Sequence, residues 1–314
     1  MRPTFRAPVL LIVSATIPVG CWSAARGDDS RKLDTESKII LQIPPLSKGK
    51  PSAGKRVAIT PREFAATKVF HTLYLPPDWQ ANGAKLPIIF EYTGNYYPPT
   101  GSTGQTQDAA LGYCLSAGRY LWVSLPYISA NQQQNAVRWW GDANATVAYA
   151  KRYVPEIVAQ FGADPNAVFL CGFSRGAIGI NYLGLHDEEI AKLWTAFISH
   201  DHFDGVKEWR GTAWGSPLKE YRRAALRRLE RIRGRPYLVS QNGRNDGTEA
   251  YLRDALPTVG NFSFNYINAQ EILGKFPNRF AKAGHTDRWA IKPSPARTRT
   301  WAWMNRVAAA SPNK

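Results

Sequence analysis

Cysteine, methionine and histidine are scarce in this chain of 314 residues. It contains three cysteines, two methionines and five histidines. Three widely spaced cysteines exclude a disulfide-rich framework, and they exclude a zinc site built from cysteine ligands. A bridge between Cys114 and Cys171 is compatible with an oxidising compartment, but no feature of the sequence requires one. The few histidines limit the side chains that can act as general bases near neutral pH.

Acidic residues are also in the minority. Asp and Glu number 24 against 40 Lys and Arg, which gives a formal net charge of +16 at pH 7. Such an excess of positive charge favours binding to anionic polymers or surfaces, for example acidic polysaccharide or an anionic membrane face. No nucleic-acid recognition motif accompanies it, so we expect no nucleic-acid partner. The densest basic segment, residues 219–235, has apolar residues at helical spacing and predicts a surface helix with a solvated charged face.

Long apolar runs are absent after the first residues of the chain. A basic start and an apolar run over residues 7–19 lead to the small-x-small sequence Ser23-Ala-Ala. This layout predicts a signal peptide over residues 1–25 and an exported protein, periplasmic or extracellular, with no transmembrane span after signal removal. Lipoprotein anchoring at Cys21 stays open as an alternative.

The remaining chain divides into a polar segment and one large domain. Residues 26–60 are rich in Lys, Ser, Pro and Gly and predict a flexible lead-in, with ordered structure beginning near Val69. The hydrophobic content of 44% can bury a large core. Residues 61–314 are therefore predicted to form a single domain, and we expect a monomer.

Apolar runs and helical patterns alternate through this domain. Strands are predicted at residues 69–75, 86–92, 120–126, 168–170, 193–199, 236–240 and 262–266, and helices at residues 107–117, 143–161, 219–235 and 296–310. The alternation with short connections predicts an α/β fold with a doubly wound, mostly parallel sheet. Ligands of such sheets bind at the carboxyl ends of the strands, where polar loops follow each run.

One motif carries specific chemistry. Gly172-Phe-Ser-Arg-Gly176 joins a buried strand to the start of a helix and has the form Gly-x-Ser-x-Gly. In this context it predicts a nucleophile elbow, a tight turn that exposes a serine oxygen above the sheet. The turn strains the serine backbone, and side chains at positions 172 and 176 would collide with the neighbouring strand or helix. The motif therefore predicts Ser174 as a nucleophile.

A nucleophilic serine needs a base and an acid that orients the base. His285 alone among the histidines follows the last predicted strand, and its Gly-His-Thr-Asp context predicts the base. Asp246 ends a Gly-x-x-Asp turn after the next-to-last strand and is predicted as the acid. Asp201 and Asp204, one strand earlier, remain alternatives for the acid.

The negative charge that develops on an attacked carbonyl oxygen needs backbone donors. The N–H group of Arg175 follows the serine, and by position the second donor is expected at Asn95 in the loop after the 86–92 strand. The charged side chain of Arg175 could attract an anionic substrate or pair with a neighbouring carboxylate.

Three further residues, His202, Asp204 and Trp140, are expected to bind substrate in the wall of the pocket. Aromatic side chains near these loops suit stacking on sugar or phenolic rings. His200 and His202 have the spacing of a metal-ligand pair, but no third ligand is evident. We therefore expect neither a metal nor another cofactor.

With these motifs in place, the chain resembles the α/β-hydrolases. The stretch from Phe161 to Leu170 before the elbow is similar to secreted esterases of the feruloyl/acetylxylan esterase and polyhydroxyalkanoate depolymerase type. The resemblance covers the layout of residues 69–310. It implies a secreted serine carboxylester hydrolase that forms an acyl-enzyme and acts on small-molecule esters or on acyl or uronic esters of polysaccharides, anionic ones included. The chain departs from these relatives at Thr93-Gly94, where they carry a His-Gly sequence, and this puts the second oxyanion donor in doubt.

Two other hypotheses stay open. A serine peptidase of the prolyl-oligopeptidase catalytic type shares this domain, although the present chain is too short to carry the usual propeller. A non-catalytic carbohydrate-binding protein could also be built on a hydrolase scaffold. The predicted set of Ser174, Asp246 and His285 argues against the non-catalytic hypothesis.

Overall fold

The computed structural model describes residues 38–243, 247–256, 261–276 and 284–310. The predicted signal peptide, Cys21 and Asp246 lie outside these ranges, as do residues 26–37 of the expected lead-in. Within the described part of the chain, no helix has the length and apolar character needed to span a membrane.

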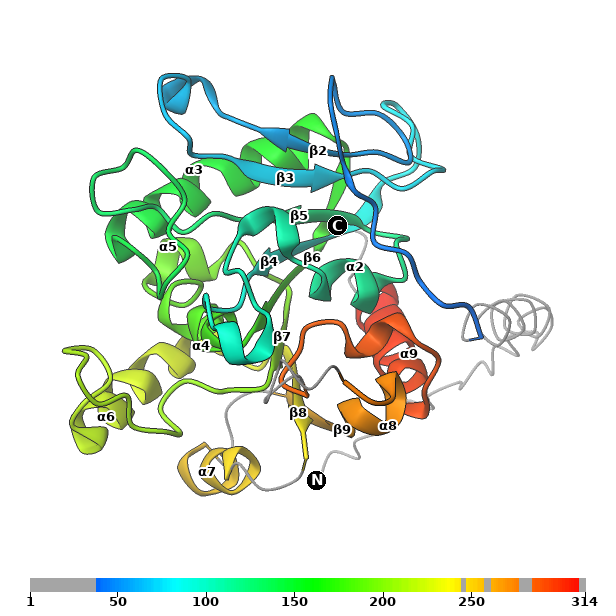
Figure 1. The fold of residues 1–314 in the computed structure, drawn as a ribbon. Helices are drawn as coiled ribbons and strands as arrows, with labels where there is room; N and C mark the ends of the chain where they lie inside the picture. The colour runs from blue at the N-terminus through cyan, green and yellow to red at the C-terminus, as the bar shows by residue number, and fades with distance from the viewer. Residues whose placement is uncertain (1–37, 244–246, 257–260, 277–283, 311–314) are drawn as a thin grey trace, which may run out of the picture. The chain divides into compact units, whose positions relative to one another are not determined.

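A nine-stranded sheet organises the structure (Figure 1). Its strands are β1 (Leu46–Ser47), β2 (Arg56–Ile59), β3 (His71–Tyr74), β4 (Leu86–Tyr92), β5 (Leu121–Ser124), β6 (Ala163–Phe173), β7 (Ala196–His200), β8 (Pro236–Asn242) and β9 (Asn261–Ile267). In space they follow the order β1-β2-β3-β5-β4-β6-β7-β8-β9. All neighbours from β5 to β9 are parallel, whereas β3 is antiparallel to both β2 and β5. The prediction of a mostly parallel, doubly wound sheet is confirmed.

Helices alternate with these strands. They are α2 (Leu111–Ser116), α3 (Ala143–Gln160), α4 (Arg175–Tyr182), α5 (Glu188–Ala191), α6 (Leu218–Leu229), α7 (Thr248–Ala255), α8 (Ala269–Leu273) and α9 (Pro295–Ala310), with short 3-10 helices η1 (Arg62–Phe64), η2 (Pro98–Thr100), η3 (Thr106–Asp108), η4 (Glu230–Ile232) and η5 (Trp289–Ile291). The chain passes from β4 to β5 in one direction and returns past β4 to reach β6. Loops that follow the strands at such a reversal form the usual binding crevice of an open α/β sheet.

Each central strand buries both of its faces, which explains the continuous apolar runs in the sequence. In β4, Ile88 and Phe90 belong to one core cluster, together with residues of α3, α4 and α6. Ile89, between them, points to the other face and packs in the cluster that contains residues of α2 and α9. Successive side chains of a strand alternate between faces, so one apolar run supports two helical layers.

The expected flexible lead-in needs a correction. Ordered structure does not begin near Val69, because β1 and β2 come before it and join the sheet. Arg56 of β2 is buried, and its guanidinium carbon lies 4.0 Å from the ring centroid of Trp122. A buried arginine in a four-residue strand resembles a polar loop in the sequence, which explains why the pattern concealed this strand.

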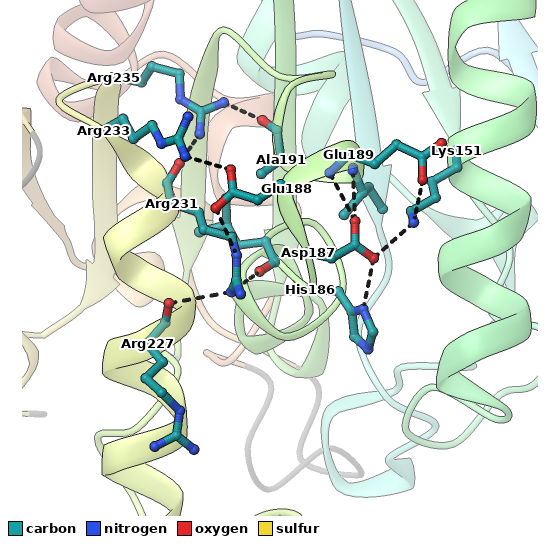
Figure 2. A network of polar contacts seen from close by, with 12 residues as sticks. Lys151, His186, Asp187, Glu188, Glu189, Ala191, Arg227, Arg231, Arg233 and Arg235 are labelled. Carbon is teal, nitrogen blue, oxygen red and sulfur yellow. Dashed lines mark hydrogen bonds and ion pairs between the residues drawn. The ribbon is translucent and has the colours of Figure 1, made fainter.

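The basic segment also differs from the expected solvated face, as Figure 2 shows. Arg231 and Arg233 form ion pairs with Glu188 at the start of α5, with N–O distances of 3.5 and 2.7 Å. On the other side of α5, Lys151 of α3 contacts Asp187, which caps the helix by accepting bonds from two backbone N–H groups. Several of the basic residues therefore anchor neighbouring elements instead of facing only water.

Both cysteines within the described ranges, Cys114 and Cys171, are buried and unbridged. Burial raises the pKa of each thiol well above its ordinary value. Both side chains pack in the same core cluster, where a thiol acts as a small apolar group. The optional Cys114–Cys171 bridge is not formed in this structure.

Candidate active site

Ser174 lies in the turn between β6 and α4 in a strained backbone conformation. Its φ and ψ angles are 55° and −118°, which a non-glycine residue rarely adopts. A Cβ atom at position 172 would meet the carbonyl of Gly176, and one at position 176 would meet the carbonyl of Tyr92. The two glycines therefore let the turn pass close to itself and to β4. This is the geometry of a nucleophile elbow.

His285 and Asp201 are joined by a hydrogen bond. The Nδ1 atom of His285 lies 3.0 Å from Oδ2 of Asp201, and Oδ1 of Asp201 accepts a bond of 2.6 Å from the backbone N–H of Asn242. Burial alone would raise the pKa of Asp201, but the neighbouring histidines and the Asn242 N–H together lower it to about 2. Asp201 is therefore a carboxylate at neutral pH, directly behind the imidazole of His285.

A second histidine braces this pair. His200, the last residue of β7, lies 3.1 Å from the carbonyl of Thr286 through Nε2 and 3.0 Å from Oγ of Ser240 through Nδ1. Burial lowers the pKa of His200, so its neutral form can donate to the carbonyl and accept from the hydroxyl. His200 directly precedes Asp201, and Thr286 directly follows His285. The bond between His200 and Thr286 therefore connects the two chain segments that carry Asp201 and His285. In the sequence, His200 has the spacing of a metal-ligand pair with His202, and no local pattern indicates its partners Ser240 and Thr286.

Ser174 and His285 face one cavity of about 450 Å³, which we call the aromatic cavity. Its lining residues are Asn95, Tyr97, Thr100, Trp139, Ser174, Arg175, His202, Lys207, Trp209 and His285. The rings of Trp139 and Trp209 meet edge to face at a centroid distance of 5.1 Å. His202 lies next to His285, with ring centroids 5.2 Å apart, and burial lowers the pKa of His202 to about 3. His202 is consequently neutral at physiological pH.

The predicted oxyanion donors lie at the same cavity. Arg175 is the first residue of α4, and the first N–H groups of a helix have no partner inside the helix. The side-chain oxygen of Asn95 accepts bonds from the backbone N–H of Trp139 at 2.8 Å and from the Arg175 guanidinium at 3.4 Å. Because this oxygen is occupied, Asn95 can offer the cavity only its N–H groups.

The side chain of Arg175 neither faces the cavity as a site for an anionic substrate nor pairs with a carboxylate, the two roles considered from the sequence. It is 1% exposed, and its guanidinium donates to the carbonyls of Thr93, Gly104, Ala136 and Trp139. The guanidinium carbon also lies 4.1 Å from the ring centroid of Tyr127. These partners leave it neither exposed to an anionic substrate nor paired with a carboxylate. Its role in the structure is to fasten the Asn95 and Trp139 loops to the elbow.

We expect Arg175→Lys to lower the free energy of unfolding by roughly 2–4 kcal/mol, because a buried lysine cannot reproduce a planar fork that serves several carbonyls. Urea unfolding monitored by circular dichroism measures this loss. Arg233→Lys is the matched control, since Arg233 is 63% exposed and its pair with Glu188 contributes at most about 1 kcal/mol. A similar small loss in both variants would contradict the structural role of Arg175.

Two of the predicted substrate-binding residues, Trp140 and Asp204, do not line the aromatic cavity. Trp140 is buried, stacks on Tyr182 with centroids 4.0 Å apart, and donates from Nε1 to the carbonyl of Arg175. Asp204 is fully buried and accepts two bonds from Arg228, at 2.8 and 3.1 Å. Both expectations are therefore corrected. Trp139, beside Trp140 in the chain, lines the cavity in its place.

The predicted acid Asp246 lies outside the described residues, and the carboxylate next to His285 in the structure is Asp201, one of the two alternatives. No group of three His, Cys, Asp or Glu side chains that could hold a metal ion occurs within the described ranges.

Neither a protein-family model nor a curated protein sequence matches the chain. Solved structures do. A fungal esterase from Rhizomucor miehei matches with a TM-score of 0.50 and 15% identity over 94% of this chain and 93% of that one. A protein described as an arylesterase gives a TM-score of 0.50 and 12% identity over 91% and 93% of the two chains. Another esterase gives 0.51 and 13% over 82% and 79%.

Some matched proteins are considerably longer. The chain spans 43% of an isopeptidase and 62% of a thermostable esterase, with TM-scores of 0.45 and 0.48. The matches with TM-scores of 0.50 and 0.51 show a shared fold, and this chain itself has a mostly parallel sheet with a strained serine turn between β6 and α4. The chain therefore has the α/β-hydrolase fold.

Proposed function

We propose that the chain is a serine carboxylester hydrolase that works through an acyl-enzyme. One arrangement carries the proposal: Ser174 in a strained elbow faces the same cavity as His285, and His285 is bonded to the buried carboxylate of Asp201. A serine, a histidine and an orienting carboxylate in these roles are the requirements of nucleophilic acyl transfer.

The proposed chemistry follows from the two nitrogens of His285. Its Nδ1–H donates to Asp201, so Nε2 is left to accept the proton of Ser174 Oγ while that oxygen attacks the ester carbonyl. The negative charge on the carbonyl oxygen is stabilised by the N–H groups of Arg175 and Asn95. His285 then gives its proton to the departing alcohol, and a water molecule activated by the same nitrogen releases the acid from Ser174.

We propose Asp201 as the acid in preference to Asp246. Asp201 directly follows β7, has a φ angle of 60° and is held by the Asn242 N–H, so its carboxylate is fixed in place. Its lowered pKa keeps it charged whenever His285 becomes protonated during the reaction. A fixed anion at this position stabilises the imidazolium and selects the productive tautomer.

For the substrate we propose a chemical class, the carboxylesters, and not a single compound. The matched proteins of similar length are described as esterases, which supports a carboxylester as the substrate class. The first 25 residues suggest export. The net charge is +16 for the full sequence and +14 without Arg2 and Arg6 of this segment. Both features support acyl or uronic esters of polysaccharides, anionic polysaccharides included.

A panel of nitrophenyl esters and aminoacyl nitroanilides tests the reaction class. We expect the nitrophenyl esters to be hydrolysed and the aminoacyl nitroanilides to show no hydrolysis above background, because the proposed substrate class is a carboxylester. Ser174-dependent hydrolysis of the anilides would favour a peptidase. Hydrolysis of neither class would favour a non-catalytic binding protein.

A further inference from the structure

Two cavities meet at His285. Besides the aromatic cavity, a second cavity of about 320 Å³ is bordered by the 100–105 loop and by residues 285–288, and we call it the hydroxyl cavity. His285 and Thr100 line both cavities, whereas Ser174, Asn95 and Arg175 line only the aromatic one. The nucleophile and the oxyanion donors are thus on one side of the histidine.

This placement divides an ester into two halves. The carbonyl must lie at Ser174 with its oxygen toward Arg175 and Asn95, so the acyl part belongs in the aromatic cavity. The alcohol must receive a proton from His285, which is the wall shared with the hydroxyl cavity. The alcohol part therefore extends toward the hydroxyl cavity.

The aromatic cavity has one accessible positive charge and, among its lining residues, no carboxylate. The amine of Lys207 lies 5.4 Å from the ring centroid of Trp209, and within the described ranges it forms no ion pair. The adjacent carboxylate, Glu208, is instead bonded to Ser216 and Arg210. His202 is neutral, and the Arg175 guanidinium is already bound to carbonyls. Lys207 is therefore the group that can bind an anion there.

The hydroxyl cavity has the opposite character. Its lining residues include Thr93, Thr100, Ser102, Thr103, Gln105, Asp108, Thr286, Asp287 and Arg288. Two carboxyl groups, on Asp108 and Asp287, accompany the single cation of Arg288, and burial raises the pKa of Asp287. Closely spaced hydroxyl, amide and carboxyl groups suit the donors and acceptors of an uncharged polyol, while the carboxylate of Asp108 disfavours an anionic alcohol.

We infer that the site selects esters whose acyl part is an apolar or aromatic body ending in an anionic group, bound by Lys207, and whose alcohol part is an uncharged polyol. This inference rests on the proposed esterase function. It assigns the preference for an anionic substrate to one side chain, in place of Arg175 or the overall charge.

A matched pair of substrates isolates the charge. The glyceryl esters of cinnamic acid and 4-carboxycinnamic acid share the alcohol and the ring and differ by one carboxylate. We expect kcat/KM to be roughly three- to tenfold higher for the carboxylated ester, the size of effect given by a partly exposed ion pair. Lys207→Met should remove this preference, and Lys207→Glu should reverse it.

Lys219→Met is the matched control, because Lys219 is an exposed lysine of α6 that does not line either cavity. It should keep the preference of the unaltered protein. Labelling of Ser174 by an uncharged fluorophosphonate, measured for each variant, reports whether the site is still folded. An unchanged preference in a labelled Lys207→Met protein would overturn the inference.

A third ester distinguishes failure of this inference from failure of the proposed esterase function. Cinnamate esterified to glyceric acid carries its carboxylate on the alcohol, and we expect it to be the poorest of the three substrates. A preference for this ester, or equal rates for all three, would overturn the division of the two cavities while leaving the esterase function intact. Absence of Ser174-dependent hydrolysis of every ester would contradict the proposed function, and the inference with it.

Discussion

Replacing Ser174 by alanine is expected to lower kcat for ester hydrolysis by roughly 10³- to 10⁶-fold, because the variant has no oxygen that can form the acyl-enzyme. The residual rate would come from the oxyanion donors and from binding alone. Steady-state hydrolysis of a nitrophenyl ester by both proteins measures the ratio.

Covalent labelling gives an independent measurement of the same prediction. A fluorophosphonate should attach to Ser174 in the unaltered protein, and peptide mapping identifies the labelled residue. Ser129→Ala is the control, because Ser129 lines neither cavity, and this variant should keep full activity and labelling. A label on another serine, or a Ser174→Ala protein of normal activity, would show that the elbow has a different purpose.

The central part of the fold could be predicted because its physical signal is strong. β4 was predicted at its observed bounds, Leu86–Tyr92, since a strand buried on both faces is a continuous apolar run between polar loops. The first strands could not be predicted in the same way. β2 contains Arg56, which is buried against Trp122 and bonded to Thr72, both of which come later in the chain. A pattern of neighbouring residues cannot reveal such partners.

The members of the site differ in how local their signals are. Ser174 was found because the elbow needs glycines at fixed neighbouring positions, and that requirement is visible in five residues. The acid has no such local signature. β7 and β8 are adjacent and parallel, so the segments that follow these two strands leave the same edge of the sheet. Asp201 directly follows β7, and in the sequence Asp246 comes after the residues of β8. The sequence order alone could not decide which carboxylate reaches His285.

The walls of the aromatic cavity show a further limit of sequence reasoning. Trp139 and Trp140 are neighbours with equivalent chemistry, yet the first lines the cavity and the second packs on Tyr182 in the core. The difference comes from an irregular backbone, in which Trp139 has a φ angle of 45°. No helical or strand periodicity applies to such a loop, so its side-chain directions are available only from the structure.

The choice of acid leads to the second large expected effect. Asp201→Asn should lower kcat by roughly 10⁴-fold, because an amide at this position no longer stabilises the imidazolium and can favour the wrong tautomer of His285. Since the pKa of Asp201 is lowered to about 2, the carboxylate is ionised from pH 5 to pH 8, and we expect a loss at every pH in this range. Measuring kcat across this range tests the size of the effect.

The same lowered pKa predicts a signature in stability. A carboxyl group whose pKa is lower in the folded state stabilises the fold at pH values above its unfolded pKa of about 3.9, and this contribution disappears as the pH falls toward about 2. The unaltered protein should therefore lose more unfolding free energy between pH 5 and pH 2.5 than Asp201→Asn does.

Asp246→Asn is the matched control for the change in kcat. It is expected to change kcat less than about tenfold, because His285 is already bonded to Asp201. If Asp246→Asn is instead the crippling change and Asp201→Asn is mild, the acid is Asp246, and the bond between Asp201 and His285 does not orient the base during catalysis.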